Sequence, residues 1–152
     1  MIPSALDNLM NIAAHGSDAH FSHKDMPSDY RPVPSQVITQ ALAILSKFSE
    51  KVLQYLIWVN PTPDGRIMFE IEYECHYLAV TLAGVENKAE VYMVHQPLKG
   101  EDIGDTLMVG GSVEGLSSII FAFINQLNLD LTLDEDKLKK LAELNNAYTD
   151  VQ

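Results

Sequence analysis

Three side chains could take part in catalysis or metal binding: those of Cys75 and His76, which are adjacent in the sequence, and that of His95. A cysteine thiolate is a nucleophile, and a histidine imidazole can bind a metal ion or transfer protons near neutral pH. A small metal- or thiol-dependent enzyme is therefore one hypothesis. A nucleophile or metal site also needs a further positioned carboxylate or imidazole, and the sequence identifies none. Strand-end histidines that are satisfied by the backbone or by water are the favoured interpretation, and no catalytic residue is predicted.

Whether the two histidines meet depends on how two predicted strands pair. If Val80 lies opposite Val91, then His76 lies opposite His95, and Tyr73 faces His76 across the preceding loop. If Val80 instead lies opposite Met93, the histidines are separated. Both registers keep apolar residues on one face, so both remain open at this point.

A second group of histidines precedes the predicted core domain. His15, His20 and His23 occur near Asp18 and Asp25, all of which are residue types that can bind divalent ions. Their spacing matches no diagnostic metal motif. The glycine-rich "VGGSVEG" likewise lacks the lysine of a phosphate-binding loop and is interpreted as a loop plus a helix N-cap. No metal and no cofactor is predicted.

Carboxylates and tyrosines alternate onto the opposite face of the predicted sheet. These residues are Glu70, Glu72, Tyr77, Glu90 and Tyr92. Acid-base catalysis by paired carboxylates requires a pocket that shifts their pKa values, and an open sheet face offers none. Tyrosine and glutamate together suit contact with a basic protein, because tyrosine gives contact area at little cost in conformational entropy. These five residues are the candidate protein-binding site, and a solvated sheet face without a partner is the alternative interpretation.

The net charge of the chain indicates which classes of macromolecule it could bind. The 152 residues include 21 acidic and 10 basic side chains, which gives a net charge of −11. Such a surface repels nucleic-acid phosphates and anionic lipid, so neither is an expected partner, whereas a protein with a basic surface is. The single cysteine excludes an internal disulfide and, with no signal-like or membrane-spanning stretch, predicts a cytoplasmic protein.

Three strands are expected to hold the candidate residues. Within "NPTPDGRIMFEIEY", Pro63, Asp64 and Gly65 fit a type I turn, and strict alternation from Ile67 to Tyr73 then predicts a strand. A four-residue loop over 73–76 would pair the next strand with matched faces: Glu72 with Tyr77, Ile71 with Leu78, Phe69 with Val80, and Ile67 with Leu82. A third strand over 89–95 completes a three-stranded antiparallel meander. Residues 96–111 read mainly as loop, with a short strand at 106–109.

Amphipathic periodicity predicts helices on both sides of these strands. A short helix over 4–13 is expected with Ser4 as N-cap and Leu6, Leu9, Met10 and Ala13 on one side. A continuous helix over 35–55 is expected with Ser35 as its N-cap, and residues 58 and 59 follow it in an extended segment. Ser112 caps a buried helix expected beside the long helix on the apolar sheet face, with the stripe Val113, Leu116, Ile120, Phe123 and Leu127. A final helix is expected over 133–147.

The run "PTPDGRIMFEIEYECHYLAVTL" resembles a pattern found in small uncharacterised bacterial proteins, in which a long helix precedes a Pro-Thr-Pro-Asp-Gly turn and antiparallel strands. The resemblance spans residues 35–83. This chain has Arg66 where that pattern often has a second glycine, and Glu70-Ile71 where it often has Glu-Trp. The resemblance implies a bacterial or phage setting and carries over no catalytic residue.

These observations predict an α+β fold with a long helix, a three-stranded meander and a second buried helix. Residues 1–34 form an N-terminal arm with a short helix, 35–128 the core domain, and 129–152 a C-terminal helical appendage. The favoured function is a non-catalytic module that binds or neutralises a protein partner, as an antitoxin, immunity protein or phage-encoded inhibitor does. A secretion-type chaperone dimer is an alternative, and an exposed sheet edge is a candidate site for homodimerisation or for strand addition.

Overall fold

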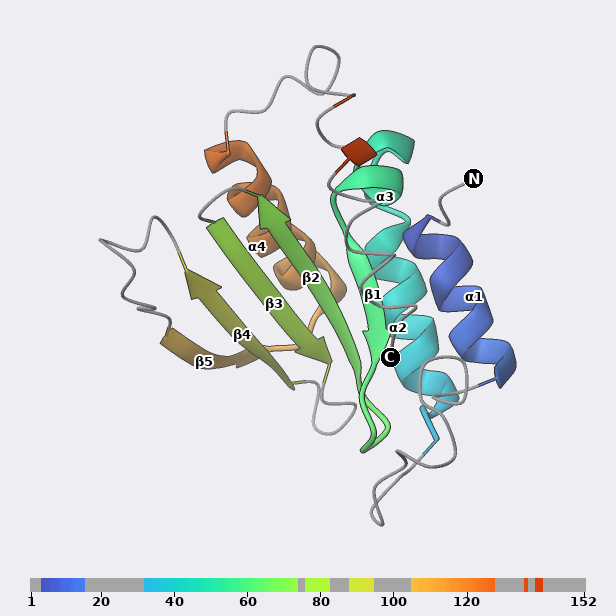
Figure 1. Cartoon of the computed structure of the whole chain (residues 1–152). Coiled ribbons are helices and arrows are strands. Elements are labelled where there is room, and N and C mark those ends of the chain that lie inside the picture. The colour runs from blue at the N-terminus through green and yellow to red at the C-terminus, as the bar shows by residue number, and fades with distance from the viewer. Residues whose placement is uncertain are drawn as a thin grey trace.

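The computed structural model describes residues 4–15, 32–73, 76–82, 88–94, 105–127, 136, 139 and 140. The elements, in chain order, are α1 (Ala5–His15), α2 (Ser35–Leu45), α3 (Glu50–Tyr55), β1 (Trp58–Pro61), β2 (Ile67–Tyr73), β3 (His76–Leu82), β4 (Lys88–Val94), β5 (Asp105–Gly110) and α4 (Val113–Gln126) (Figure 1). This order of helices and strands confirms the α+β class. Residues 1–3 and 16–31 of the predicted arm over 1–34, and most of the helix expected over 133–147, lie outside the described residues.

All five strands form one antiparallel sheet in the order β1-β2-β3-β4-β5. The predicted three-stranded meander corresponds to β2, β3 and β4, so three strands was too few. The extended segment after the first helices became β1, and the short strand expected over 106–109 became β5. Both edge strands are short, with 4 and 6 residues, and a short run gives little alternation from which a strand can be recognised.

The strand registers follow the apolar pattern. The four predicted pairs between β2 and β3 are all present. Pairing continues to Tyr73 opposite His76, so the loop expected over 73–76 is wrong at both of its end residues. Val80 lies opposite Val91, which decides between the two registers left open for β4. A slip to Met93 would have kept the faces matched but shortened the ladder.

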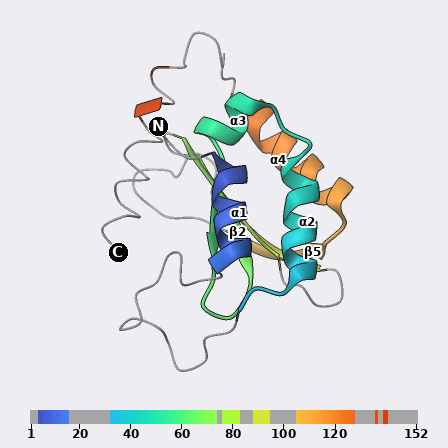
Figure 2. The same cartoon turned by 90° about the vertical axis from the view of Figure 1, so that its right-hand side faces the viewer.

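Three helices cover one face of the sheet. Figure 2 shows α2, α3 and α4 on the same side, and α4 packs against α2 and β3 as predicted. The face toward these helices carries the fully buried residues of β2 and β3, including Ile67, Phe69, Leu78, Val80 and Leu82. In the predicted stripe of α4, Leu116, Ile120 and Phe123 are buried and the two end residues are half-buried.

The continuous helix predicted over 35–55 is wrong. Helix α2 ends at Leu45, and α3 begins after Ser49, whose hydroxyl accepts a hydrogen bond of 3.4 Å from the N–H of Val52. Serine competes for backbone hydrogen bonds and therefore favours helix ends, and two serines flank the break. Apolar spacing continues through the break because Phe48 and Val52 both face the core. Periodicity alone therefore did not reveal it.

Helix α1 packs against β1 and α2, with Ala5, Leu9 and Ile12 buried in the common core. The predicted N-cap is confirmed: the Ser4 hydroxyl accepts a hydrogen bond of 3.2 Å from the Asp7 N–H, while the Asp7 carboxylate accepts one of 3.0 Å from the Ser4 N–H. The prediction placed the apolar side of this helix about one residue too far along the chain, since Met10 and Ala13 are exposed whereas Leu9 and Ile12 are buried. Similarly, Pro34 rather than Ser35 is the N-cap of α2.

Candidate protein-binding face

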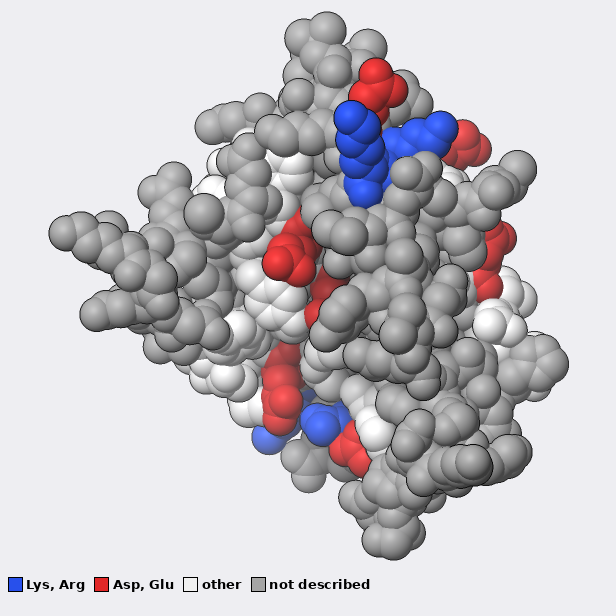
Figure 3. All heavy atoms as spheres, viewed as in Figure 1, with Lys and Arg blue, Asp and Glu red and all other residues white. Residues whose placement is uncertain are grey.

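The five candidate residues, Glu70, Glu72, Tyr77, Glu90 and Tyr92, all lie on the sheet face away from α2 and α4, called here the outer face. They come from β2, β3 and β4, which the register places side by side. Figure 3 views this face and shows acidic side chains running down it, with basic side chains at its lower end. Glu72 is exposed, and the other four are half-buried. The sequence therefore predicted correctly that these residues share a face.

A hydrogen-bond network fixes Glu70 at the centre of the outer face. The Tyr77 hydroxyl donates to Oε2 of Glu70 over 2.6 Å, and the Asn60 side-chain amide donates to Oε1 over 3.0 Å. The three residues belong to three adjacent strands, β1, β2 and β3. Both carboxylate oxygens therefore have a protein donor, and each still has a lone pair for a donor from outside.

The same network changes the acidity of Tyr77. Burial disfavours the phenolate, and the hydrogen bond to Glu70 together with the negative charge of that carboxylate disfavours it further, so the pKa of Tyr77 is raised far above its ordinary value. Tyr77 is consequently a neutral hydrogen-bond donor throughout the physiological range. It acts as a structural support for Glu70 and supplies no base.

Aromatic surface lies beside this carboxylate. The rings of Tyr77 and Tyr92 are 5.9 Å apart and meet edge to face, which is a favourable aromatic geometry. Two half-buried tyrosines next to Glu70 and the exposed Glu72 present both π-faces and negative charge. Arginine and lysine side chains are attracted to that combination.

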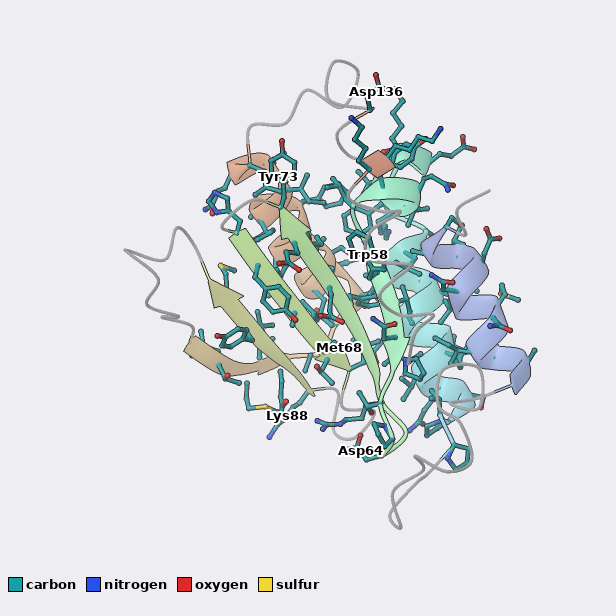
Figure 4. All side chains as sticks on the ribbon, viewed as in Figure 1. Trp58, Asp64, Met68, Tyr73, Lys88 and Asp136 are labelled. Atoms are coloured by element: carbon teal, nitrogen blue, oxygen red, sulfur yellow. The ribbon has the colours of Figure 1, made fainter. Side chains whose placement is uncertain are left out.

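The positively charged side chain of Arg66 lies at one end of the row of acidic residues on the outer face. The Nη1 atom of Arg66 lies 3.6 Å from Oε2 of Glu90, and its Nε lies 2.9 Å from Oδ2 of Asp64, an ion-pair distance without hydrogen-bond alignment. These side chains are about one third or more exposed, so solvent screens both pairs. Figure 4 shows Asp64 and Lys88 at this end of the sheet, with Met68 nearer its middle.

Asp64 has the turn role that the sequence predicted. The Gly65 N–H donates over 3.2 Å to the Thr62 carbonyl, which places Pro63 and Asp64 at the centre of the turn, and Gly65 has a φ of 83°. Partial burial alone would raise the pKa of Asp64, but the hydrogen bond from Thr62 and the adjacent Arg66 together hold it below its ordinary value. The carboxylate is therefore engaged within the turn.

Of the three residues in the enzyme hypothesis, Cys75, His76 and His95, the structure describes only His76. His76 lies opposite Tyr73 at the end of the helix-covered face, where its half-buried ring meets Phe123 edge to face at 6.5 Å. Cys75 and His95 lie outside the described residues, as do His20 and His23. Among the residues that are described, no three His, Cys, Asp or Glu side chains are grouped so that they could hold a metal ion.

Of the glycine-rich "VGGSVEG", only Gly111 and Ser112 lie between β5 and α4, because Val109 and Gly110 belong to β5 and not to the predicted loop; the predicted N-cap at Ser112 is confirmed. The Ser112 hydroxyl accepts a hydrogen bond of 3.1 Å from the Gly115 N–H, and the Gln40 side chain donates to the Gly111 carbonyl. The segment therefore ties α4 to α2. None of the helices in the described part of the chain has the length and apolar character needed to cross a membrane.

Comparison with known proteins found no match to the chain among family models, curated proteins or solved structures. Its function must therefore be inferred from the outer face itself. The sequence analysis missed two residues of that face. Asn60 donates a hydrogen bond to Glu70, and Arg66 forms an ion pair with Glu90. Extending the alternation back through the turn into the first strand would have placed both on the same face as Glu70.

Proposed function

We propose that the protein is a non-catalytic interaction module that binds a basic protein partner through the outer face of its sheet. The arrangement of Glu70, Tyr77 and Tyr92 carries this proposal: a carboxylate is oriented by neighbours next to two aromatic rings that are 5.9 Å apart. A side chain that is already fixed loses little conformational entropy on binding. An arginine or lysine of the partner would meet a preorganised site.

Electrostatics supports the same class of partner. The chain carries a net charge of −11, and acidic residues run along the outer face. A basic protein is attracted over a distance comparable to the Debye length, and its association rate would fall as salt is added. Binding that neutralises an active partner, in the manner of an antitoxin, an immunity protein or a phage-encoded inhibitor, needs only such a surface.

A capture experiment with charge-reversal variants tests the proposal. Immobilised full-length protein is incubated with bacterial lysate, and captured proteins are quantified by mass spectrometry. Glu72→Lys reverses an exposed charge on the outer face, whereas the control Glu114→Lys reverses an exposed charge on α4. One basic protein, captured stoichiometrically by the wild type and the control but at least tenfold less by Glu72→Lys, would support the proposal. Equal capture by all three proteins, or no capture, would refute it.

A secretion-type chaperone is a second candidate, and one observation favours it. Among the described residues no strand pairs with the outer edge of β5, and Leu107 and Met108 are exposed on its two faces. Chaperones of this kind hold an extended segment of their client, which such an edge can accept by strand addition. This candidate differs from the first in what it binds. An unfolded client segment would be captured through β5, and capture would not depend on Glu72.

A further inference from the structure

The two edges of the sheet are protected unequally. The β1 edge lies beside α1, which packs against it, and β1 ends in Pro61. Strand β5 pairs with β4 on one side only, and no other strand of the described chain lies beyond it (Figure 1). Natural proteins usually guard such an edge with lysines, prolines, bulges or a covering helix. Residues 106–110 of β5, Thr-Leu-Met-Val-Gly, contain neither a charged residue nor a proline.

Exposure along β5 is high for apolar side chains. Leu107 is 62% exposed and Met108 is 57% exposed, and they point to opposite faces because successive strand residues alternate. The edge therefore presents apolar surface on both faces, as well as backbone N–H and C=O groups that no other strand of the described residues pairs. An added strand would cover all three kinds of surface at once.

We propose that β5 is the site at which two copies of this chain associate, by antiparallel pairing of β5 with the β5 of a second copy. A two-fold axis perpendicular to the sheet keeps the faces matched when Met108 lies opposite its own copy and Leu107 lies opposite the Val109 of the second copy. The two five-stranded sheets then become one. Their outer faces are continuous, although the proposal does not depend on what those faces bind.

Charge favours a second copy over a basic partner at this edge. Two chains of charge −11 repel each other, so they can approach closely only where acidic residues are absent. Residues 106–110 are uncharged, and Asp105 is the only acidic residue of the strand. In the antiparallel pair, the two Asp105 residues lie at opposite ends, about 20 Å apart, well beyond the Debye length of about 8 Å. A basic partner would find no carboxylate along the uncharged stretch.

The pairing is expected to be weak. A strand of 6 residues is about 20 Å long, and the area that it covers is at the low end for stable protein interfaces. Dissociation in the micromolar range follows from such a small interface. The full-length protein should therefore change from monomer to dimer as its concentration rises from about 1 to about 300 micromolar.

Sedimentation velocity of two matched variants tests this. Met108→Lys places like charges opposite each other across the two-fold axis, and it should weaken the dimer at least tenfold. Within one chain the new ammonium would lie opposite Glu90, which favours correct folding of the variant. The control Met10→Lys makes the same change on α1, at a side chain that is 58% exposed. Both variants reduce the net negative charge, so general repulsion predicts equal or stronger association for both.

Loss of the dimer in Met108→Lys, with Met10→Lys unchanged, would support the proposal. A wild-type monomer at every concentration, or a dimer that both variants retain, would overturn it. Hydrogen-deuterium exchange of the wild type gives a second test that needs no variant. Within residues 105–110, the alternate amides that point away from β4 should exchange at least tenfold more slowly at the highest concentration, and unchanged exchange of these amides would also overturn the proposal.

Discussion

The Tyr77 hydroxyl donates a 2.6 Å hydrogen bond across the sheet to Oε2 of Glu70. Strands β2 and β3 place the two residues on the same face but not directly opposite each other, since Glu70 pairs with Ala79 and Tyr77 with Glu72. The bond is therefore diagonal, and the length of the tyrosine side chain makes it reachable. It couples the orientation of the central carboxylate to the protonation of a phenol.

Tyr77→Phe is expected to lower the free energy of unfolding by about 1 kcal/mol at neutral pH, because a hydrogen bond to a partly buried carboxylate is lost. The control is Tyr55→Phe, which removes the same atom from a half-buried tyrosine with no hydrogen bond to the described residues. Urea unfolding of both variants measures the difference. Equal, negligible losses would show that the bond contributes nothing.

The pH dependence of stability should also differ in Tyr77→Phe. The folded-state pKa of Tyr77 is raised above its ordinary value of 10.0, so its contribution to stability is complete below about pH 10 and is lost as pH rises above it toward the folded pKa. Wild type should therefore lose stability more steeply than the variant as pH rises above about 10. Because the ring is half-buried, screening limits this difference to less than about 1 kcal/mol.

The alternating pattern of β2 and β3 made their register predictable, because a slip by one residue would have exposed a whole apolar row. The same reasoning correctly gathered Glu70, Glu72 and Tyr77 on one face. Such a pattern says which face a residue occupies, but not which neighbours it contacts. The donors to Glu70 therefore could not be assigned, and the contribution of Asn60 was missed because β1 has only 4 residues.

Helix ends were less predictable than faces. Ser112 and Ser35 both precede apolar helical runs, yet Ser112 caps its helix while Ser35 is already the first residue of α2. At α2 the cap position is taken by Pro34, whose ring fixes its φ near the observed −64°, although proline has no side-chain group that could bond to the helix. The break between α2 and α3 was hidden for another reason: apolar spacing is kept across it, and only the serines mark it.

Gly65→Ala should destabilise the protein by about 1 to 2 kcal/mol, because residue 65 has a φ of 83°, where an added Cβ clashes with the backbone. Gly110 provides the matched control. A Cβ added there meets nothing within 4 Å, so Gly110→Ala should change stability by less than about 0.5 kcal/mol. Thermal or urea unfolding measures both. Equal effects would mean that the turn does not require a left-handed residue.

Leu9→Ala tests whether α1 is part of the core. Leu9 is fully buried against β1 and α2, and truncation of a buried leucine leaves a cavity, so a loss of about 2 to 5 kcal/mol is expected. The neighbouring Met10 lies on the same helix but is 58% exposed, and Met10→Ala should cost less than about 0.5 kcal/mol. Both changes introduce alanine, so helix propensity alone favours neither outcome. If the two variants unfold at the same urea concentration as wild type, α1 does not contribute to the cooperative core; a loss confined to Leu9→Ala would establish that it does.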